Sequence, residues 1–317
     1  MSNNYSFFRG LHKLSGKKFS TLDELLAATG LDFSVKLEEL YYKRNGNEIG
    51  QQFKSAIVRE DNDVCVGTGS TIYGVVQYRE WFAACEELIN HKGIEVIFGG
   101  APNLGEQALL VFRQEGEISL GNDKKIVNHF LVSSTHDGSG KLTVLPIPMD
   151  THGLVMNVDQ PVMAIKHSKK ANDRVLESKQ ILEKVGNAWA AFEDNVKRLM
   201  NVRITEEETR NFIKGVVGDK DSTRSQNIRD KIYDISKTGI SRFYPNCQGT
   251  LFGVVLSCIE WADNHQTVRA SKYCDETTAA MNAKLVGDGA TKKAKAWGTA
   301  LTLMRNKDKL KLTGNAS

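Results

Sequence analysis

The chain has few cysteines and no long apolar run. Its five cysteines among 317 residues are odd in number and widely spaced, and no two of them form a C-x-x-C pair. This pattern argues against a disulfide framework or a zinc site, so we expect reduced, mostly buried thiols. No apolar stretch approaches the roughly 18 residues of a membrane span, and the N-terminus lacks a signal-peptide core. We therefore expect a cytoplasmic protein without a membrane partner.

Motifs for nucleotide binding and catalysis are also missing. Segment 10-GLHKLSGKK-18 has the wrong glycine spacing for a phosphate loop, and 67-GTGST-71 lacks the G-x-G-x-x-G pattern of a dinucleotide loop. No G-x-S-x-G elbow occurs, and the histidines do not have zinc-ligand spacing. We expect no cofactor and no metal. Whether the chain is an enzyme stays open, and a non-enzymatic role is favoured.

What is present indicates a mixed fold. Segments before about residue 170 mostly alternate with period two and are punctuated by glycine, whereas later segments follow the helical period. The sequence predicts an α+β protein, with an antiparallel sheet in the N-terminal half packed on helices and a helical C-terminal half. We expect four parts: an irregular segment with a short helix over 1–56, an α+β core over 57–203, a helical region over 204–305 and a frayed basic tail over 306–317.

Capping and turn motifs position the elements. Thr21 and Glu24 have capping-box spacing for a short helix that ends at Gly30, and Thr205 and Glu208 repeat this spacing further on. The turn 136-HDGSG-140 predicts a tight hairpin with Gly138 at positive φ. The expected strands are 94–100, 108–114, 126–135 and 141–147, followed by an extended segment over 151–167. The expected helices are 79–90, 172–201, 222–238, 249–265 and 290–305.

Positive charge is concentrated in residues 166–203 and 266–317, whereas the remainder of the chain is net acidic. The run 166–170 has no carboxylate before Asp173, so it either contacts phosphates or is a solvated helix start. The tip around His136 is likewise either a simple turn or a phosphate-binding hairpin. Tyr73 and Tyr78 either stack on bases or pack in the core. The candidate nucleic-acid contacts are Arg113, His136, Lys141, Lys166, His167, Lys169, Lys170 and Arg174.

Four segments carry a family resemblance. Segment 133-SSTHDGSG-140 is similar to an N-S-H-D-G-S turn, and 165-IKHSKKANDRVLES-178 is similar to an R-I-R-H-T segment with its following helix. Residues 248–270 and 284–304 are similar to a Gly-Thr, Asp-His, Arg pattern and to a closing F-G-x-G, Lys, Ala pattern. Over about 57–305 the chain thus resembles the phage/plasmid-like family catalogued as domain of unknown function 932. It departs from that family at 149-MDTHGLVMN-157, where the family has a Cys-x-Asn-Thr element, and at Lys166, where it has Arg.

The resemblance implies DNA maintenance, recombination or defence evasion on a mobile element. We expect a DNA-binding protein of a phage or plasmid, similar in role to ATP-independent annealing recombinases of the RecT/Redβ class. Single-stranded DNA is the expected partner, and homo-oligomers would present it a continuous groove. The alternative is an antirestriction or host-interaction protein that binds a host or phage protein. The third hypothesis is a metal-dependent nuclease, but the E-x-K motif at 177–179 lies on an expected helix.

Overall fold

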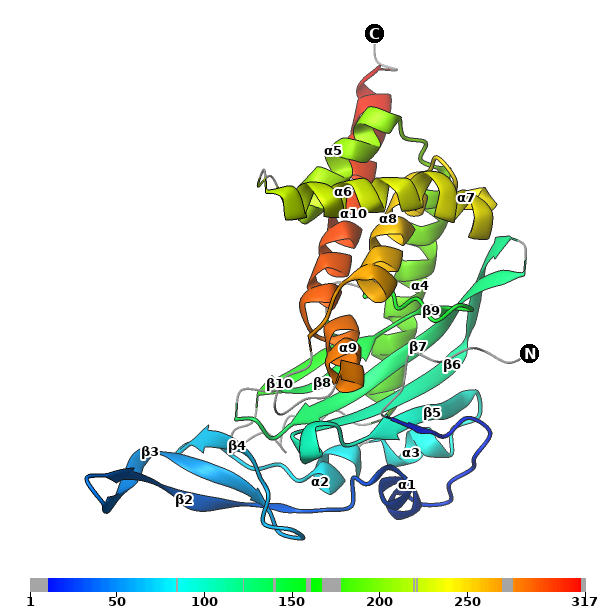
Figure 1. Cartoon of the computed structure of the whole chain (residues 1–317). Helices are drawn as coiled ribbons and strands as arrows, with labels where there is room; N and C mark the ends of the chain where they lie inside the picture. Colours follow the sequence, from blue (N-terminus) through cyan, green and yellow to red (C-terminus); the bar gives the residue numbers. More distant parts are fainter. Residues whose placement is uncertain are drawn as a thin grey trace.

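The computed structural model describes residues 11–83, 85–121, 123–138, 141–157, 161–166, 178–218, 220, 222–269 and 276–314. Its strands are β1 (His12–Lys13), β2 (Val35–Arg44), β3 (Asn47–Arg59), β4 (Cys65–Ser70), β5 (Ile94–Gly100), β6 (Gln107–Gly121), β7 (Lys124–Thr135), β8 (Lys141–Pro146), β9 (Met149–Asp150) and β10 (Met163–Lys166). Its α-helices are α1 (Leu22–Thr29), α2 (Tyr78–Ala83), α3 (Glu86–Ile89), α4 (Ser178–Asn201), α5 (Glu206–Val217), α6 (Thr223–Asp234), α7 (Ile240–Phe243), α8 (Leu251–Glu260), α9 (Glu276–Leu285) and α10 (Asp288–Gly314). Short 3-10 turns are η2 (Asn103–Gly105) and η5 (Pro245–Cys247), and π-helical turns are η4 (Ile235–Gly239) and η6 (Trp261–His265). The antiparallel sheet followed by helices confirms the predicted α+β class (Figure 1).

The main sheet is a seven-stranded antiparallel sheet in the order β1-β5-β6-β7-β8-β10, with β9 also pairing with β7. Consecutive strands β5 to β8 lie next to one another, so the predicted meander is confirmed. The long β6–β7 pairing runs from Gln107 opposite Thr135 to Gly121 opposite Lys124. Helices pack on both faces of this pairing, so it lies at the centre of the core (Figure 1).

The two faces of the sheet bury different sets of side chains because successive strand residues point to opposite sides. Phe112 and Phe130, stacked at 5.0 Å, pack on the first face with α1, α2, α3 and the start of α4. Leu131 points to the second face, where Met281 and Leu285 of α9 cover it. At the far ends of β6 and β7, Ile118, Leu120 and Ile126 extend the core into the helical bundle.

Helix α4 connects the sheet to the bundle. Its predicted stripe is confirmed, since Trp189 and Phe192 are only 9% and 3% exposed, and the Phe192 ring stacks on Trp297 of α10 at 5.0 Å. The N-terminal part of α4 contributes Val185 to the core of the sheet, whereas Trp189 and later residues belong to the bundle core. One continuous helix therefore ties the two halves together. Residues 172–177, where this helix was predicted to begin, lie outside the described ranges.

Both capping motifs form. The Thr21 hydroxyl accepts from the Glu24 backbone N–H, and Gly30 ends α1 with φ of 66°. Thr205 and Glu208 make a reciprocal capping box at α5. The predicted helix over 79–90 differs in detail, because α2 and α3 are separate short helices around Cys85.

Two expectations at the ends of the chain were wrong. Within 1–56, which we expected to be irregular, β2 and β3 form a long hairpin that joins β4 in a second, three-stranded sheet. Most residues of this hairpin are exposed on both faces, so its sequence carries no alternating apolar signal. At the other end, α10 continues to Gly314 through most of the expected frayed tail. Among the described residues, none of the helices combines the length and apolar composition of a membrane span.

Candidate functional site

Two of the predicted phosphate contacts lie side by side at the edge of the main sheet. Strand β10 is the last strand in the sheet order, and it pairs with β8 so that Lys166 stands directly opposite Lys141. Both lysines are exposed, whereas their neighbours Leu142 and Ile165 point into the core. Like charges in directly opposed positions destabilise a strand pair. We call Lys141 and Lys166 the lysine edge.

Four other predicted contacts, His167, Lys169, Lys170 and Arg174, follow Lys166 in the sequence and lie outside the described residues. In the sequence they lie within eight residues of Lys166. The structure thus pairs two segments that are separate in the sequence: β8, which follows the 136–140 turn, and β10, which ends at Lys166, the first residue of the basic block.

The remaining predicted contacts do not join this edge. Arg113 lies on β6 opposite His129 of β7. Thr135, at the end of β7 next to the turn that leads to Lys141, is about 20 Å further along the strand. The Arg113 guanidinium is 3.9 Å from the Glu117 carboxylate, and it lines a surface pocket together with Glu95 and Glu115. The surroundings of Arg113 are therefore acidic.

His136 lies inside the molecule. Only 1% of the residue is exposed, and its ring stacks on Tyr78 with 4.1 Å between centroids. Tyr78 is fully buried and its hydroxyl donates to the carbonyls of Gly105 and Glu106. Tyr73 is buried as well. Of the two interpretations of these tyrosines, core packing is confirmed and base stacking is wrong, because neither ring has an open face at the surface.

The turn that contains His136 fastens the second sheet to the first. A Cβ added to Gly67 of β4 would lie 2.4 Å from the His136 carbonyl oxygen, and one added to Gly138 would lie 2.0 Å from the Thr68 carbonyl oxygen. The two backbones thus touch at glycines, where no side chain separates them. Gly138 has φ of 79°, as predicted for the turn. The His136–Gly138 contact therefore fixes where the β2–β3 hairpin leaves the body.

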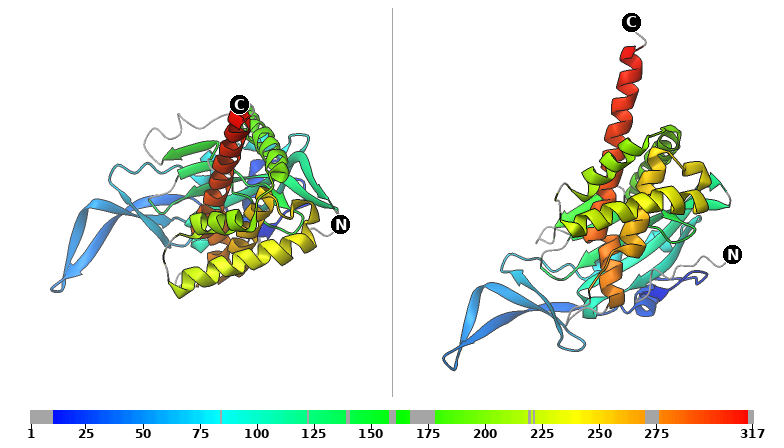
Figure 2. Two further views of the ribbon diagram at one scale, coloured as in Figure 1. Left: turned by 90° about the horizontal axis from the view of Figure 1, so that it is seen from above. Right: turned by 45° about the horizontal axis from the view of Figure 1, so that its top comes forward.

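This hairpin, which we call the arm (β2 and β3), was missed as a functional element. It projects from the body on the side where β8 begins and β10 ends (Figures 1 and 2). Three aromatic side chains, Tyr41, Tyr42 and Phe53, are exposed along it. The dipeptide Asn45-Gly46 at its tip, with both residues at positive φ, is a strong hairpin signal that would have revealed it.

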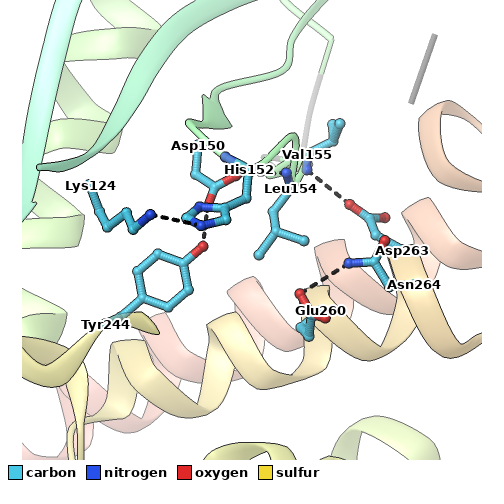
Figure 3. Close-up of polar contacts among 9 residues, drawn as sticks. All are labelled: Lys124, Asp150, His152, Leu154, Val155, Tyr244, Glu260, Asp263 and Asn264. Carbon is cyan, nitrogen blue, oxygen red and sulfur yellow. Dashed lines mark hydrogen bonds and ion pairs between the residues drawn. The ribbon is translucent and has the colours of Figure 1, made fainter. Parts of the chain in front are cut away.

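A polar network connects the segment around Asp150 to the helical bundle (Figure 3). The Asp150 carboxylate accepts hydrogen bonds from the backbone N–H groups of His152 and Leu154, at 2.9 and 2.7 Å, and from the Tyr244 hydroxyl. Burial and the neighbouring carboxylate raise the pKa of Tyr244. The His152 ring lies 3.6 Å from Asp150 and 2.8 Å from the Lys124 ammonium. These contacts hold the segment that replaces the Cys-x-Asn-Thr element against α7.

The same segment is held from the bundle by Asp263, in the π-helical turn η6. Its carboxylate accepts from the Val155 backbone N–H at 2.9 Å and from the Lys293 ammonium of α10 at 2.7 Å. Both charged side chains are fully buried, and burial lowers the pKa of Lys293 although Asp263 opposes this shift. Because every polar group named here already has a protein partner, the network fits a role in holding the sheet to the bundle.

The structure also bears on metal binding. In the part of the chain that it describes, no group of three or more His, Cys, Asp and Glu side chains is placed to hold a metal ion. The thiols of Cys85, Cys247 and Cys258 are buried, and burial raises the pKa of each to about 12. These three thiols are therefore protonated at neutral pH and poorly suited to nucleophilic attack.

Comparison with known proteins gives one match. The model of the family described as domain of unknown function (DUF932) matches residues 66–286, which is more than half of the chain. The matched range contains the 136–138 turn, the lysine edge and Asp263, whereas the arm and Lys293 lie outside it. No curated protein and no solved structure shows significant similarity to the chain.

Proposed function

Because the chain belongs to the domain of unknown function 932 family, whose description names no activity, we propose its function from its own geometry. We propose that it binds single-stranded DNA without ATP, with the lysine edge as a phosphate-binding site. In its finer form, the proposal is an annealing protein of a phage or plasmid that acts in the cytoplasm. The phage or plasmid setting rests on the sequence resemblance alone.

The observation that carries the proposal is the direct opposition of Lys141 and Lys166. Directly opposed residues of a strand pair share one face of the sheet, so a single phosphate could contact both exposed ammonium groups. The pair also lies near the rim of the main sheet, because β10 is the last strand in its described order. The cations that follow at 167–174 would add further phosphate contacts along the bound DNA strand.

Single strands fit this edge better than a duplex does. A duplex reader inserts a helix or a ribbon into a groove and makes contacts with base edges. Two lysines on the rim of a twisted sheet instead offer contacts to one flexible backbone, whose bases remain free to stack or to pair. Exposed bases are what annealing to a complementary strand requires.

The test is a salt titration of binding to a labelled single-stranded oligonucleotide, measured by fluorescence anisotropy. Each phosphate contact contributes about −0.7 to the slope of log affinity against log salt. Lys141→Gln with Lys166→Gln should therefore flatten the slope by about 1.4 and weaken binding at low salt. Arg113→Gln is the matched control, because it removes a cation of the same sheet that lies among glutamates. Duplex of the same sequence should bind more weakly than the single strand.

Two outcomes would contradict the proposal. Absence of single-strand binding by the wild-type protein at low salt would remove the function altogether. Binding with an unchanged salt slope in the double variant would remove the lysine edge from it. The exposed Leu37 and Phe53 of the arm favour a second candidate, a host-interaction protein that works through apolar contacts. The affinity for such a host protein would depend little on salt. The same salt titration, carried out with that host protein, would show this.

A further inference from the structure

The arm exposes large aromatic side chains to an unusual degree. Phe53 is 75% exposed, Tyr41 54% and Tyr42 46%, and none of the three belongs to a core cluster. Isolated two-stranded hairpins are marginal in water, so an arm of this length gains nothing in stability from carrying open rings. All three residues belong to the arm, which projects from the body (Figure 1). Their exposure therefore requires a reason other than folding.

The strand register places one of these rings against a glycine. Tyr41 pairs with Gly50 across the arm, and a Cβ added to Gly50 would lie 3.5 Å from the Tyr41 ring. The ring therefore lies against Gly50, where no side chain stands in its way, while 54% of Tyr41 stays exposed. Tyr42 is the next residue on the strand and pairs with Ile49, so it points to the opposite side of the arm. Aromatic surface is therefore offered on both sides.

Cations accompany these rings. In the outer part of the arm, residues 40–54, the charged side chains are Lys43, Arg44, Lys54 and a single carboxylate, Glu48. Three cations against one carboxylate, which lies 3.8 Å from Lys43, leave residues 40–54 with a net positive charge. Just outside this range, the Glu39 carboxylate accepts a hydrogen bond from the Tyr41 hydroxyl. Alternation of open rings with cations is the arrangement that binds single strands, because bases stack on the rings while phosphates meet the cations.

We propose that the arm is a base-stacking platform for single-stranded nucleic acid that extends the phosphate contact of the lysine edge. The inference rests on the proposed function and adds where the bases bind. The two parts are linked physically, because β4, which pairs with the arm, touches the His136–Gly138 turn that leads into β8 and Lys141. Since the arm precedes residues 66–286, it is an element of this chain outside the range that the family model matches.

A second copy of the chain is a poorer occupant of the same surface. A stable dimer interface buries about 1,200–2,000 Å² and has a contiguous apolar centre. On the arm, Tyr41 and Tyr42 point to opposite sides, Lys43 and Arg44 follow them, and Gln51 and Gln52 precede Phe53. Single rings spaced between polar residues suit bases, which stack one at a time.

The experiment compares two arm variants on two probes. In the first variant, Tyr41, Tyr42 and Phe53 are changed to alanine, and in the second, Tyr41→Phe and Tyr42→Phe keep the rings. The probes are an oligothymidine and an oligonucleotide of the same length in which abasic sites replace the central bases. For oligothymidine, the alanine variant should bind about five-fold to a hundred-fold more weakly for each stacked base lost, with the salt slope unchanged. The phenylalanine variant should bind like the wild type.

The abasic probe makes the test specific for stacking. It should bind the wild-type protein more weakly than oligothymidine does, and the alanine variant should bind the two probes about equally. Circular dichroism and a melting curve confirm that the body of the alanine variant is folded. If folding fails, the single variant Phe53→Ala and the abasic probe on wild-type protein carry the comparison.

Three results would overturn the inference. Wild-type affinity in the alanine variant, together with a salt slope that depends on Lys141 and Lys166, would reject the platform and leave the proposed function intact. A fall in mass of the alanine variant by light scattering would identify the arm as an interface between copies. Absence of wild-type binding to either probe would remove both the platform and the function on which it rests.

Discussion

The ammonium of Lys293 donates to the Asp263 carboxylate across 2.7 Å, and neither side chain is exposed to solvent. Removal of one partner leaves the other as an uncompensated buried charge, which typically costs about 3–5 kcal/mol. We expect Lys293→Met to lower the free energy of unfolding by this amount in urea denaturation. Asp263→Asn added to Lys293→Met should recover part of the loss, since the amide oxygen still accepts from the Val155 N–H.

An exposed ion pair gives the control for this prediction. Lys197 lies 2.6 Å from Glu193 on α4, where solvent screens both groups. Lys197→Met should therefore cost at most about 1 kcal/mol. If Lys293→Met cost no more than Lys197→Met, the buried pair would not hold α10 to η6, and our account of the polar network would be wrong.

His129 should make the protein sensitive to mild acid. Burial lowers the pKa of this histidine to about 3, compared with about 6.5 when the chain is unfolded. Between these values the unfolded chain binds a proton that the folded protein does not bind, so stability falls as the pH drops below about 6.5. At about pH 5 the loss from this group is about 2 kcal/mol.

The measurement is the free energy of unfolding of wild type and His129→Gln near neutral pH and near pH 5. The variant lacks the titrating ring, so its stability relative to wild type should improve by about 2 kcal/mol on acidification, whatever the carboxylates contribute to both proteins. His91→Gln, which removes an exposed histidine, serves as the control. A constant difference between wild type and His129→Gln at the two pH values would show that His129 is not kept neutral by burial.

Elements that are buried on a regular face could be read from the sequence. Strands β5 to β8 and the α4 stripe were predicted because their burial imposes a period on the apolar residues, as Trp189 and Phe192 illustrate. The arm imposes no such period, since both of its faces are exposed, and only the Asn45-Gly46 dipeptide marks it. Pattern alone therefore found the core and missed the projecting element.

Positions set by tertiary contacts were beyond the reach of the sequence. Lys141 and Lys166 meet because β10 returns to pair with β8, a register that residue types alone do not fix. His136 stands in a polar stretch and was expected at an exposed tip, yet the turn folds against β4 and buries it. Lys293 was part of a basic run, but its side chain turns inward toward a buried carboxylate that is distant in sequence.

The contact between the 136–138 turn and β4 can be tested with two glycines of nearly identical φ. Gly138 has φ of 79° and Gly16 has φ of 80°, so a valine at either position meets the same backbone strain of about 1–2 kcal/mol. At Gly16 nothing lies within 4 Å of an added Cβ, whereas at Gly138 the Thr68 carbonyl oxygen would be 2.0 Å away. Gly138→Val must also push the two backbones apart.

We therefore expect the melting temperature to fall further in Gly138→Val than in Gly16→Val, by the equivalent of about 1–3 kcal/mol for the forced overlap. Separation of the two backbones should also free the root of the arm, which limited proteolysis would detect as earlier cleavage near β4 in Gly138→Val alone. Equal melting temperatures and equal cleavage in the two variants would mean that the turn does not fasten the second sheet. The arm would then have no fixed direction relative to the lysine edge, and single-stranded DNA bound at the lysine edge would not be guided to the arm.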